Sequence, residues 1–565
     1  MKVIVIGGVA AGPKAASKII RNNPEAEVTI IEKGEFLSYA GCGLPYYISG
    51  VVKEQKELMS TPIGIVRDSV FFQNVKNVNV LNHTEAVAID RKNKTVKIKR
   101  ANETEEELPY DKLVLATGAS PVKPQLPGMT LKNIFTLHEV EDAEGIKNML
   151  SENRVIDAVI IGGGLIGVEM AEALAERGCR VSIVEMLDQI LPMFDSEIAA
   201  LMEKRFEEKG IKILTGTKVL CFDGGKEVHK VMTEREPLTA DMVIMSVGVR
   251  PNVSLAVSCG LETGKTGAMK VNPQMQTSDP NIYAAGDCTE TVNLITNKPA
   301  FIPRGATANK HGRVAANDIC GIKDGFRGVL GSTICKIFDF TAAKTGLSER
   351  EARLAGFDPV ICLSPAPDRA HFMPEAKLLY LKLVANRKTR KLLGAQAAGS
   401  GVCDKRIYTA ATAISAGMTI DDMANLDLCH APPYAPAMDN MIVAANILRN
   451  KLDGVMIGIK PKGAKKKVEK KGSSVLLLDV RSPAEVAENK IEPSMNIPLG
   501  KLRSEIEKLD VFKDWEIIVL CKISLRGYEA ALILKSKGFE NVKVMDGGIL
   551  MWPYAGRRKI QGGEK

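Results

Sequence analysis

Paired cysteines are absent from this sequence. None of its eleven cysteines forms a CxxC pair, so neither a zinc site nor a dithiol redox pair is indicated, and we expect no metal. An odd number without regular spacing is typical of free thiols in a reducing cytoplasm, the localisation we predict. No apolar run reaches the roughly 18–20 residues of a membrane span, and Met1–Val9 lacks the basic region and cleavage site of a signal peptide. We therefore expect no membrane partner.

A broad excess of one charge is also missing. The formal net charge is +9, but part of it lies in the short stretch Lys460–Lys471, and acids and bases nearly balance elsewhere. A chain without an extended basic face is not expected to bind nucleic acid. We interpret Lys460–Lys471 as a solvated, flexible tether. At 565 residues the chain is long enough for about three or four domains.

The sequence does contain one supersecondary pattern twice. The predicted strand Lys2–Ile6 runs into Gly7-Gly8-Val9-Ala10-Ala11-Gly12, and Val159–Ile161 runs into Gly162-Gly163-Gly164-Leu165-Ile166-Gly167. A helix follows each turn, and then a second strand that ends in an acid, Glu32 or Glu185. One glycine motif is a weak signal, but two complete copies predict an α/β fold with two Rossmann-like dinucleotide-binding domains.

Each motif has residue types suited to a dinucleotide. Glycines let the backbone approach a pyrophosphate at the helix N-terminus, and the acid accepts hydrogen bonds from ribose hydroxyls. Val9 replaces the second glycine of the first motif, which widens that turn and favours FAD there. The expected FAD residues are Gly7, Val9, Ala10, Ala11, Gly12, Glu32 and Lys33. The expected NAD residues are Gly162, Gly164, Leu165, Ile166, Gly167, Glu185 and Gly248.

The residues after Glu185 indicate which nicotinamide cofactor is used. Met186 and Leu187 follow it, and no arginine is present to meet a 2′-phosphate, so we expect NADH in preference to NADPH. Two further segments support FAD: the strand that ends in Ala116-Thr117-Gly118, and the small-residue strand that ends before Asp287. With these segments, Met1–Leu452 resembles the glutathione-reductase-like flavoprotein reductases with two dinucleotide-binding domains.

The redox group predicted beside the flavin is a single cysteine, Cys42, in the segment Ser38–Tyr47. Glutathione-reductase-like enzymes carry two cysteines in a CxxxxC motif, whereas a lone cysteine must take its partner sulfur from elsewhere. We therefore predict a mixed disulfide or persulfide on Cys42. Its position where loop becomes helix is expected to favour the thiolate.

The segment Cys42-Gly43-Leu44-Pro45-Tyr46-Tyr47 resembles the coenzyme A-disulfide reductase branch of the superfamily. That resemblance implies a homodimer and coenzyme A binding, with contacts at the matching positions Lys14, Lys18, Arg21, Ser38, Asn309 and Lys310. Related NADH oxidases and peroxidases carry a histidine in the first glycine turn, where this sequence has Ala10. A sulfur substrate is therefore favoured over oxygen or peroxide.

The sequence departs from this branch at several site positions. Met373 and His430 stand where the branch has two tyrosines contributed by the neighbouring subunit, and Met438 and Gly41 replace a lysine and an asparagine. The loss of two phenols removes proton donors to a leaving thiolate, and we predict that His430 acts as the acid. Because hydrosulfide is a better leaving group than an alkyl thiolate, these departures favour a persulfide or polysulfide substrate.

The C-terminal segment is similar to rhodanese domains. The predicted strand Ile517–Leu520 leads into the loop Cys521–Arg526, and the helix Gly527–Lys537 follows. Such a loop directs its backbone N–H groups inward, which suits an anionic persulfide on Cys521, and Arg526 adds positive charge. We predict that Cys521 and Arg526 are catalytic residues for sulfane sulfur.

We therefore predict an α/β chain with two Rossmann-like domains, an α+β dimerisation domain and a C-terminal α/β rhodanese domain. The expected parts are an FAD domain at 1–122 and 276–325, a connection at 123–150, an NAD domain at 151–275, a dimerisation domain at 326–454, a lysine-rich linker at 455–473 and a rhodanese domain at 474–565. The predicted function is an FAD-dependent NADH:persulfide or polysulfide reductase that uses coenzyme A persulfide or that of another small thiol. Alternatives are a coenzyme A-disulfide reductase, an NADH oxidase and a flavin-based redox sensor carrying a coenzyme A mixed disulfide.

Overall fold

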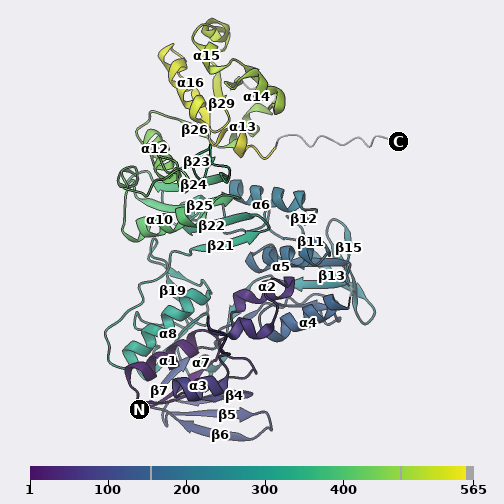
Figure 1. The fold of residues 1–565 in the computed structure, drawn as a ribbon, viewed down its shortest axis with the longest axis vertical. Coiled ribbons are helices and arrows are strands. Elements are labelled where there is room, and N and C mark those ends of the chain that lie inside the picture. Colours follow the sequence, from purple (N-terminus) through teal and green to yellow (C-terminus); the bar gives the residue numbers. More distant parts are fainter. Residues whose placement is uncertain (153–154, 471–473, 555–565) are drawn as a thin grey trace. The chain divides into compact units, whose positions relative to one another are not determined.

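The computed structural model describes residues 1–152, 155–470 and 474–554. The chain divides into two compact units (Figure 1). Unit 1 comprises Met1–Pro192 and Phe206–Gly331, and unit 2 comprises Met193–Arg205 and Ser332–Lys565. Within the described ranges, no helix combines the length and the apolar character needed to cross a membrane.

The first domain of unit 1 is built on a parallel sheet whose strands are rich in β-branched residues. In sheet order these are β18 (Ile282–Ala284), β7 (Lys112–Leu115), β1 (Lys2–Ile6), β2 (Glu27–Ile31) and β3 (Asn79–Leu81). Helices α1 (Ala11–Asn22) and α8 (Gly305–Ile319) lie side by side and pack on one face of the sheet (Figure 1). The meander β4 (Thr84–Asp90), β5 (Thr95–Arg100) and β6 (Glu105–Pro109) covers the other face.

The second domain of unit 1 repeats this plan. Its sheet contains, in order, β12 (Lys212–Leu214), β11 (Arg180–Val184), β10 (Asp157–Ile161), β16 (Met242–Met245) and β9 (Ile134–Phe135), all parallel. Its helices are α4 (Val140–Ser151) and α5 (Leu165–Glu176). The meander β13 (Val219–Gly224), β14 (Val228–Thr233) and β15 (Pro237–Thr239) packs against the sheet. β8 (Ala119–Pro121) and β17 (Val249–Pro251) form a two-stranded ribbon in this unit.

Shorter elements complete unit 1. These are η1 (Gly41–Gly43), α2 (Leu44–Ser49), η2 (Gln55–Met59), α3 (Ser69–Lys76), α7 (Ser254–Ser258), β19 (Thr291–Val292) and β20 (Pro299–Ala300). Helix α2 contacts both α4 and α5. The segment that follows η1 is therefore held between helices of the second Rossmann-like domain.

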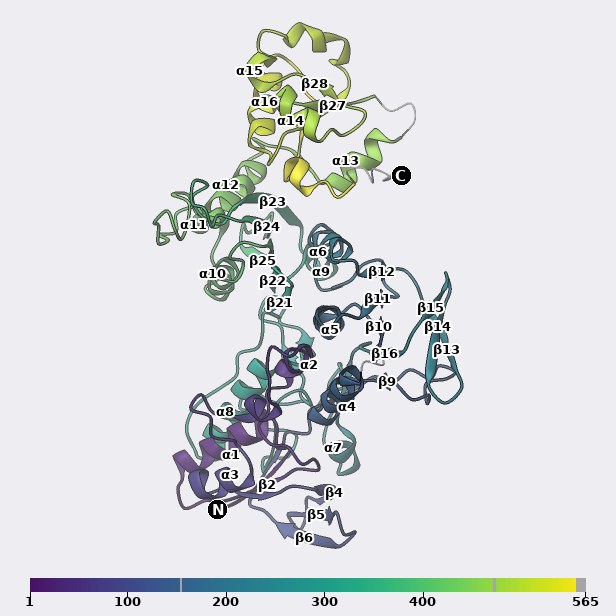
Figure 2. The same cartoon turned by 45° about the vertical axis from the view of Figure 1, so that its right-hand side comes forward.

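Unit 2 begins with an antiparallel sheet. Its order is β21 (Thr333–Ile337), β22 (Phe340–Gly346), β25 (Leu392–Gly399), β24 (Leu378–Asn386) and β23 (Pro359–Pro367). Helices α10 (Asp404–Ser415), α11 (Ile420–Met423) and α12 (Asn440–Leu452) lie along this sheet (Figure 2). Their apolar side chains are buried in one core cluster with those of the sheet. Helices α6 (Ser196–Glu208) and α9 (Glu349–Leu354) also contribute to this unit.

The C-terminal domain has a parallel sheet of its own, in the order β26 (Gly458–Ile459), β30 (Val542–Met545), β29 (Glu516–Leu520), β27 (Val475–Asp479) and β28 (Met495–Asn496). Its helices are α13 (Pro461–Val468), α14 (Pro483–Glu488), α15 (Leu499–Leu502), η3 (Ile506–Phe512), α16 (Leu525–Ser536) and η4 (Gly548–Met551). The sequence predictions of Rossmann-like, α+β and C-terminal α/β architecture are thus confirmed.

The lysine-rich stretch differs from the flexible tether that we predicted. Gly458–Ile459 pairs with β30, and Pro461–Val468 forms α13, which lies beside the sheet (Figures 1 and 2). Ala464 is buried with Leu477 and Ile518. The lysines project from a helix whose few small and apolar residues face the core, so composition alone concealed the element. Residues 471–473 and 555–565 of the predicted linker and domain lie outside the described residues.

Buried charges hold unit 2 together. The Lys382 side chain is 0% exposed, and its Nζ lies 3.1 Å from Asp195, 2.9 Å from Glu197 and 3.1 Å from Glu349. Burial lowers the affinity of Lys382 for its proton, but the three carboxylates outweigh this and raise its pKa. Lys460, just before α13, lies 3.1 Å from the same Glu349. One buried cluster thus joins α6, α9, β24 and the segment that leads into the C-terminal domain.

Lys382→Met should strongly destabilise unit 2, because it leaves three buried carboxylates without their central cation. Loss of one partner of a buried ion pair costs about 3–5 kcal/mol of unfolding free energy. Differential scanning calorimetry would measure the loss. The control is Lys388→Met, at an exposed position of the same domain, which should change stability by less than about 0.5 kcal/mol. Equal transition temperatures for the two variants would contradict the structural role of Lys382.

Candidate functional site

The two glycine turns have the same hydrogen-bond geometry. Gly7 and Gly162 adopt φ of +112° and +103°, a region that favours glycine. Glu32 accepts the N–H of Gly8 at 2.6 Å, and Glu185 accepts the N–H of Gly163 at 2.7 Å.

The second oxygen of each carboxylate is also engaged. Glu32 accepts the N–H of Gly34, and Glu185 that of Leu187, both at 2.8 Å. Each acid therefore fixes the turn that begins α1 or α5, and its remaining lone pairs suit ribose hydroxyls.

The steric surroundings of the turns fit a dinucleotide in both domains. A Cβ on Gly12 would lie 1.9 Å from the Gly7 carbonyl oxygen, and one on Gly167 would lie 2.0 Å from that of Gly162, so both glycines allow close packing. A Cβ on Gly164 would meet nothing within 4 Å, which leaves an open cradle in front of α5. Its counterpart in the first turn is Val9, which carries a side chain.

The predicted FAD residues Ala116, Thr117 and Gly118 form a turn directly after β7. Asn252 holds the Ala116-Thr117-Gly118 turn, because its Nδ2 donates to the Thr117 carbonyl at 2.8 Å and its carbonyl accepts the Thr117 hydroxyl at 2.7 Å. Gly118 has a positive φ, and so does Gly248, which is a predicted NAD residue. A Cβ on either glycine would meet nothing within 4 Å. Sequence reasoning missed Asn252, which lies in a loop far along the chain. Lys33 is exposed, and Leu165 and Ile166 open α5.

Asp287 follows β18, where the sequence placed a carboxylate for the flavin. Its Oδ1 accepts the N–H of Arg304 at 2.9 Å. Burial raises the pKa of Asp287, and the Arg304 N–H and the charges of His138 and Arg304 oppose that shift. Arg304 precedes α8, and its buried Nε has no hydrogen-bond partner among the described residues. An unpaired donor beside this carboxylate is consistent with a bound polar group there.

Cys42 lies in η1, immediately before α2, so the predicted boundary of loop and helix is present. Its side chain reaches the surface, yet the surrounding protein desolvates the thiolate. Burial raises the pKa of Cys42, the carboxylates of Glu169 and Asp287 raise it further, and Arg304 lowers it. Desolvation and the two acids therefore oppose the predicted preference of Cys42 for the thiolate, and Arg304 supports it.

Glu169 is a site residue that the sequence analysis missed. It lies in α5, the helix that opens at the second glycine turn, and influences Cys42 of the first domain. Burial raises the pKa of Glu169 to about 7, and neighbouring Glu172 adds to the effect. Glu169 lies between the apolar residues Val168 and Met170 of a core helix. This pattern could have indicated a functional residue, because carboxylates in such positions are rarely buried without a role.

The predicted coenzyme A contacts come largely from two packed helices. Lys14, Lys18 and Arg21 lie on α1, and Asn309 and Lys310 lie on the neighbouring α8. The Ser38 N–H donates to the Gly8 carbonyl at 2.8 Å, which ties this residue to the first glycine turn. The basic side chains are at least partly exposed, and their role with coenzyme A stays a prediction.

The loops that carry Met373 and His430 lie next to each other in unit 2. The Ala370 N–H donates to the Pro432 carbonyl at 3.2 Å, and His430 Nδ1 lies 3.1 Å from the Ala435 carbonyl oxygen. This proximity agrees with the expectation that both loops line one site. Cys42 belongs to unit 1, and the acid role of His430 stays a prediction.

The C-terminal sulfur loop begins at Cys521, directly after β29. Cys521 is buried, and its Sγ accepts the N–H of Ser524 at 3.1 Å. Ser524 has φ of +92°, which is strained for a non-glycine residue, and its hydroxyl donates to the Met545 carbonyl at 3.0 Å. Lys522 is exposed. The loop therefore directs a backbone N–H at the sulfur, as predicted for an anion-binding turn.

Arg526 forms an ion pair that the sequence analysis missed. Its two terminal nitrogens donate to the two oxygens of Glu485, each at 2.7 Å. The Arg526 hydrogen bonds are the largest influence on Glu485 and lower its pKa to about 2. Glu485 is the third residue after Ser482, and the two form a capping box at α14, which is a recognisable sequence signal. The positive charge of Arg526 near the loop is thus partly balanced by Glu485.

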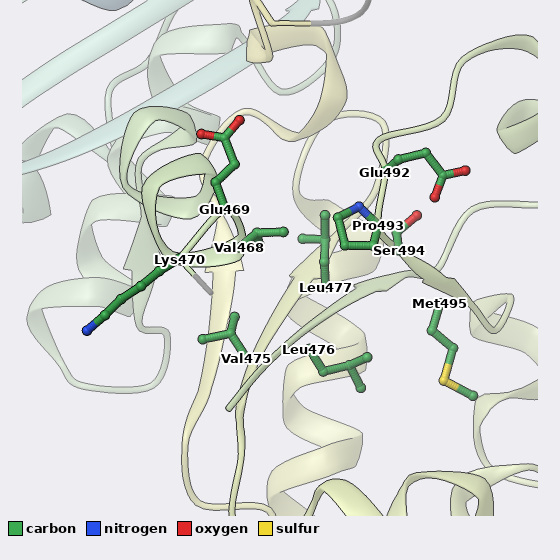
Figure 3. A pocket seen from close by; sticks show the side chains of 10 residues that line it. All are labelled: Val468, Glu469, Lys470, Val475, Leu476, Leu477, Glu492, Pro493, Ser494 and Met495. Carbon is green, nitrogen blue, oxygen red and sulfur yellow. The ribbon is translucent and has the colours of Figure 1, made fainter. Parts of the chain in front are cut away.

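One pocket of the C-terminal domain lies away from Cys521. It lies between the end of α13 and the strands β27 and β28 (Figure 3). Its lining includes Lys470, Leu477 and Met495 but no residue of the Cys521 loop. Among the described residues, no group of His, Cys, Asp and Glu is arranged to hold a metal ion.

Glu169→Gln should lower the pKa of Cys42, because it removes a negative charge that disfavours the thiolate. The rate of Cys42 alkylation by iodoacetamide, measured against pH, would report the shift, since the thiolate is the nucleophile. Glu176→Gln, at an exposed position of the same helix, is the matched control and should leave the profile unchanged. A Glu169→Gln profile that superimposes on that of the wild type would show that Glu169 does not act on Cys42.

Comparison with known families covers most of the chain. Residues 1–306 match the pyridine nucleotide-disulphide oxidoreductase family, and residues 332–442 match the dimerisation domain of the same family. Residues 460–554 match the rhodanese-like domain, so α13 is included in that match.

Individual relatives extend this result. The chain is 38% identical to an NAD(P)H sulfur oxidoreductase (CoA-dependent) of Pyrococcus furiosus, over 79% of this chain and 99% of that protein. It is 30% identical to a coenzyme A disulfide reductase of Staphylococcus haemolyticus, over 78% and 98% of the two chains.

Two solved structures are similar along nearly the whole chain. An NAD-dependent persulfide reductase from A. fulgidus is 44% identical with a TM-score of 0.93, and covers 98% of this chain and 100% of its own. The reduced CoADR-RHD of Bacillus anthracis is 36% identical with a TM-score of 0.92, over 98% and 97%. The chain therefore belongs to the pyridine nucleotide-disulphide oxidoreductase family and carries a rhodanese-like domain at its C-terminal end.

Proposed function

We propose that this protein is an NADH-dependent persulfide or polysulfide reductase, with coenzyme A persulfide as the preferred form of substrate. The observation that carries the proposal is the position of Cys42, whose thiol is coupled electrostatically to Asp287 and Arg304 in the predicted FAD cradle. The similarity to persulfide and sulfur reductases named above supports a sulfane sulfur substrate. The rhodanese-like loop at Cys521 supports it further, because that loop suits an anionic persulfide.

The chemistry requires one nucleophilic thiolate. Cys42 attacks the inner sulfur of coenzyme A persulfide, the one bonded to carbon, so that a disulfide forms between Cys42 and coenzyme A and hydrosulfide leaves with the electron pair of the broken bond. FAD, when bound, would supply two electrons taken from NADH. The disulfide between Cys42 and coenzyme A would then be reduced, so that coenzyme A leaves as its thiolate and Cys42 returns to its thiolate. Persulfide and NADH are consumed, and thiolate, hydrosulfide, NAD⁺ and a proton are produced.

Residues near Cys42 suit different stages of this cycle. Arg304 favours the thiolate before attack, whereas Glu169, with a pKa of about 7, is able to hold or release a proton close to the leaving sulfur. His430 of a neighbouring subunit is a second proposed acid. We propose that the protein acts as a homodimer in the cytoplasm, where its eleven free cysteines would remain reduced.

The nucleotide preference rests on the surroundings of Glu185. Glu185 directly follows β11, and Met186 and Leu187 after it are both exposed and uncharged. A 2′-phosphate would therefore meet a negative charge without a compensating cation, so NADPH is the weaker substrate.

A coenzyme A-disulfide reductase is the second candidate. It is favoured by the similarity to the Bacillus anthracis CoADR-RHD along nearly the full chain. It differs from the first candidate in its leaving group, an alkyl thiolate that needs stronger proton donation than hydrosulfide does. Met373 and His430, in place of two phenols, make the disulfide the poorer substrate.

Stopped-flow absorbance should separate these candidates. The NADH-reduced enzyme is mixed anaerobically with coenzyme A persulfide or with coenzyme A disulfide, and flavin reoxidation is followed. We expect at least tenfold faster reoxidation by the persulfide, a difference of about 1.4 kcal/mol in barrier height. Cys42→Ser should abolish the reaction, whereas Cys259→Ser, a cysteine of the same unit, should retain it.

Three other outcomes of the stopped-flow experiment would contradict parts of the proposal. Comparable reoxidation by the disulfide would support the second candidate and contradict the roles assigned to Met373 and His430. Absence of reoxidation by either compound would contradict both reductases and favour the redox sensor. Reoxidation by the Cys42→Ser variant would show that the sulfur–sulfur bond is cleaved elsewhere.

A further inference from the structure

The sulfur loop of the C-terminal domain is held by one short segment, Met545–Leu550. The Cys521 carbonyl accepts the Ile549 N–H at 2.9 Å, and the Lys522 carbonyl accepts the Leu550 N–H at 3.3 Å. The Ser524 hydroxyl donates to the Met545 carbonyl at 3.0 Å. These three bonds fix both ends of the turn that directs the Ser524 N–H at Cys521 Sγ. The position of the segment therefore sets the geometry of the loop.

The segment leaves little room for the loop to shift. Gly547 and Gly548 form the turn between β30 and η4, with φ of +73° and +58°. A Cβ on Gly548 would lie 2.4 Å from the Cys521 carbonyl oxygen. On its other side the turn faces the dimerisation domain, whose antiparallel sheet includes β23. A Cβ on Gly547 would lie 3.2 Å from the Cβ of Leu363 in that strand. The turn is thus placed between the sulfur loop and β23.

A buried ion pair also connects the segment Met545–Leu550 to the dimerisation domain. Asp546 Oδ1 lies 2.5 Å from Lys451 Nζ, at the end of α12, and the two side chains are only 4% and 7% exposed. Lys451 Nζ also donates to the Ile361 carbonyl of β23 at 2.8 Å. The Asp546 N–H donates to the Ile459 carbonyl of β26 at 2.9 Å. Directional bonds from two domains therefore meet at Asp546.

We infer that Lys451 and Asp546 are positioning residues for sulfur transfer at Cys521, and that full activity of the rhodanese-like domain requires its docking on the dimerisation domain. The inference rests on the proposed sulfur-carrying role of Cys521. A buried, hydrogen-bonded ion pair has one favourable geometry, and its loss frees the segment that carries Ile549 and Leu550. The Cys521 carbonyl and the Ser524 N–H then lose their fixed orientation around the sulfur.

Thiosulfate is a simple probe of this geometry. The Cys521 thiolate attacks the outer sulfur of thiosulfate, a sulfur–sulfur bond forms to Cys521, and sulfite leaves with the electron pair of the broken bond. Cyanide then takes the outer sulfur as thiocyanate and restores the Cys521 thiolate. Neither step uses NADH or the flavin, so the full-length protein reports on the loop independently of Cys42.

The test compares three variants of the full-length protein. Lys451→Met should lower kcat for thiocyanate formation roughly 10- to 100-fold, the range expected for a misplaced reacting group. KM for thiosulfate should change much less, because Lys451 does not contact the substrate. Lys451→Arg keeps the charge and should recover most of kcat. Lys508→Met, which removes an exposed ion pair with Glu505 in the rhodanese-like domain, is the matched control and should retain wild-type kcat.

A double variant distinguishes loss of the loop geometry from unfolding of the domain. Lys451→Met combined with Asp546→Asn leaves no lone buried charge, and it should fold while showing the same loss of kcat. The rate of flavin reduction by NADH should remain that of the wild type in every variant. Wild-type kcat in Lys451→Met, or in the folded double variant, would overturn the inference alone. Absence of sulfur transfer in the wild type would instead overturn the proposed role of Cys521.

Discussion

The hydrogen bond between a strand-end carboxylate and a glycine-turn N–H is the constraint on which the reductase part depends. It occurs twice, between Glu32 and Gly8 and between Glu185 and Gly163. In both places it fixes the turn in which an open backbone meets the start of a helix, the arrangement that suits a pyrophosphate. The two turns belong to parallel sheets of the same unit, and this unit also holds Cys42 beside Asp287 and Arg304. Electron transfer and thiol chemistry are therefore organised by one repeated local geometry.

Buried charge plays the corresponding role in unit 2. Lys382 joins three carboxylates, and Lys451 joins Asp546 of the C-terminal domain to a helix of the dimerisation domain. Such pairs cost desolvation free energy and contribute directionality, because only one arrangement satisfies all their hydrogen bonds. Together with α13 and β26 they make the rhodanese-like domain an integral part of unit 2.

The sequence was most informative where a local pattern had one physical solution. Lys2–Ile6 was predicted as a strand with the bounds of β1, because an apolar β-branched run before a glycine turn fits little else. The meander β4–β6 was missed, since its alternating residues are largely charged and only a few apolar ones, such as Ile89, Val96 and Ile98, face the core. The lysine-rich segment was misread because the strand β26 depends on pairing with β30, more than 80 residues away along the chain. Asn252, Glu169 and Lys451 act through contacts between distant segments, which no local pattern specifies.

The most direct test of sulfur delivery from Cys521 to Cys42 is to follow one sulfur atom through the protein. Isotopically heavy sulfane sulfur is loaded onto Cys521, excess donor is removed, and NADH and coenzyme A are added under anaerobic conditions. We expect heavy hydrosulfide from the wild type, in an amount that matches the NADH consumed. We expect none from Cys42→Ser, which should accumulate heavy coenzyme A persulfide instead. Release of heavy hydrosulfide by Cys42→Ser at the wild-type rate would contradict the claim that Cys42 reduces the sulfur that Cys521 delivers.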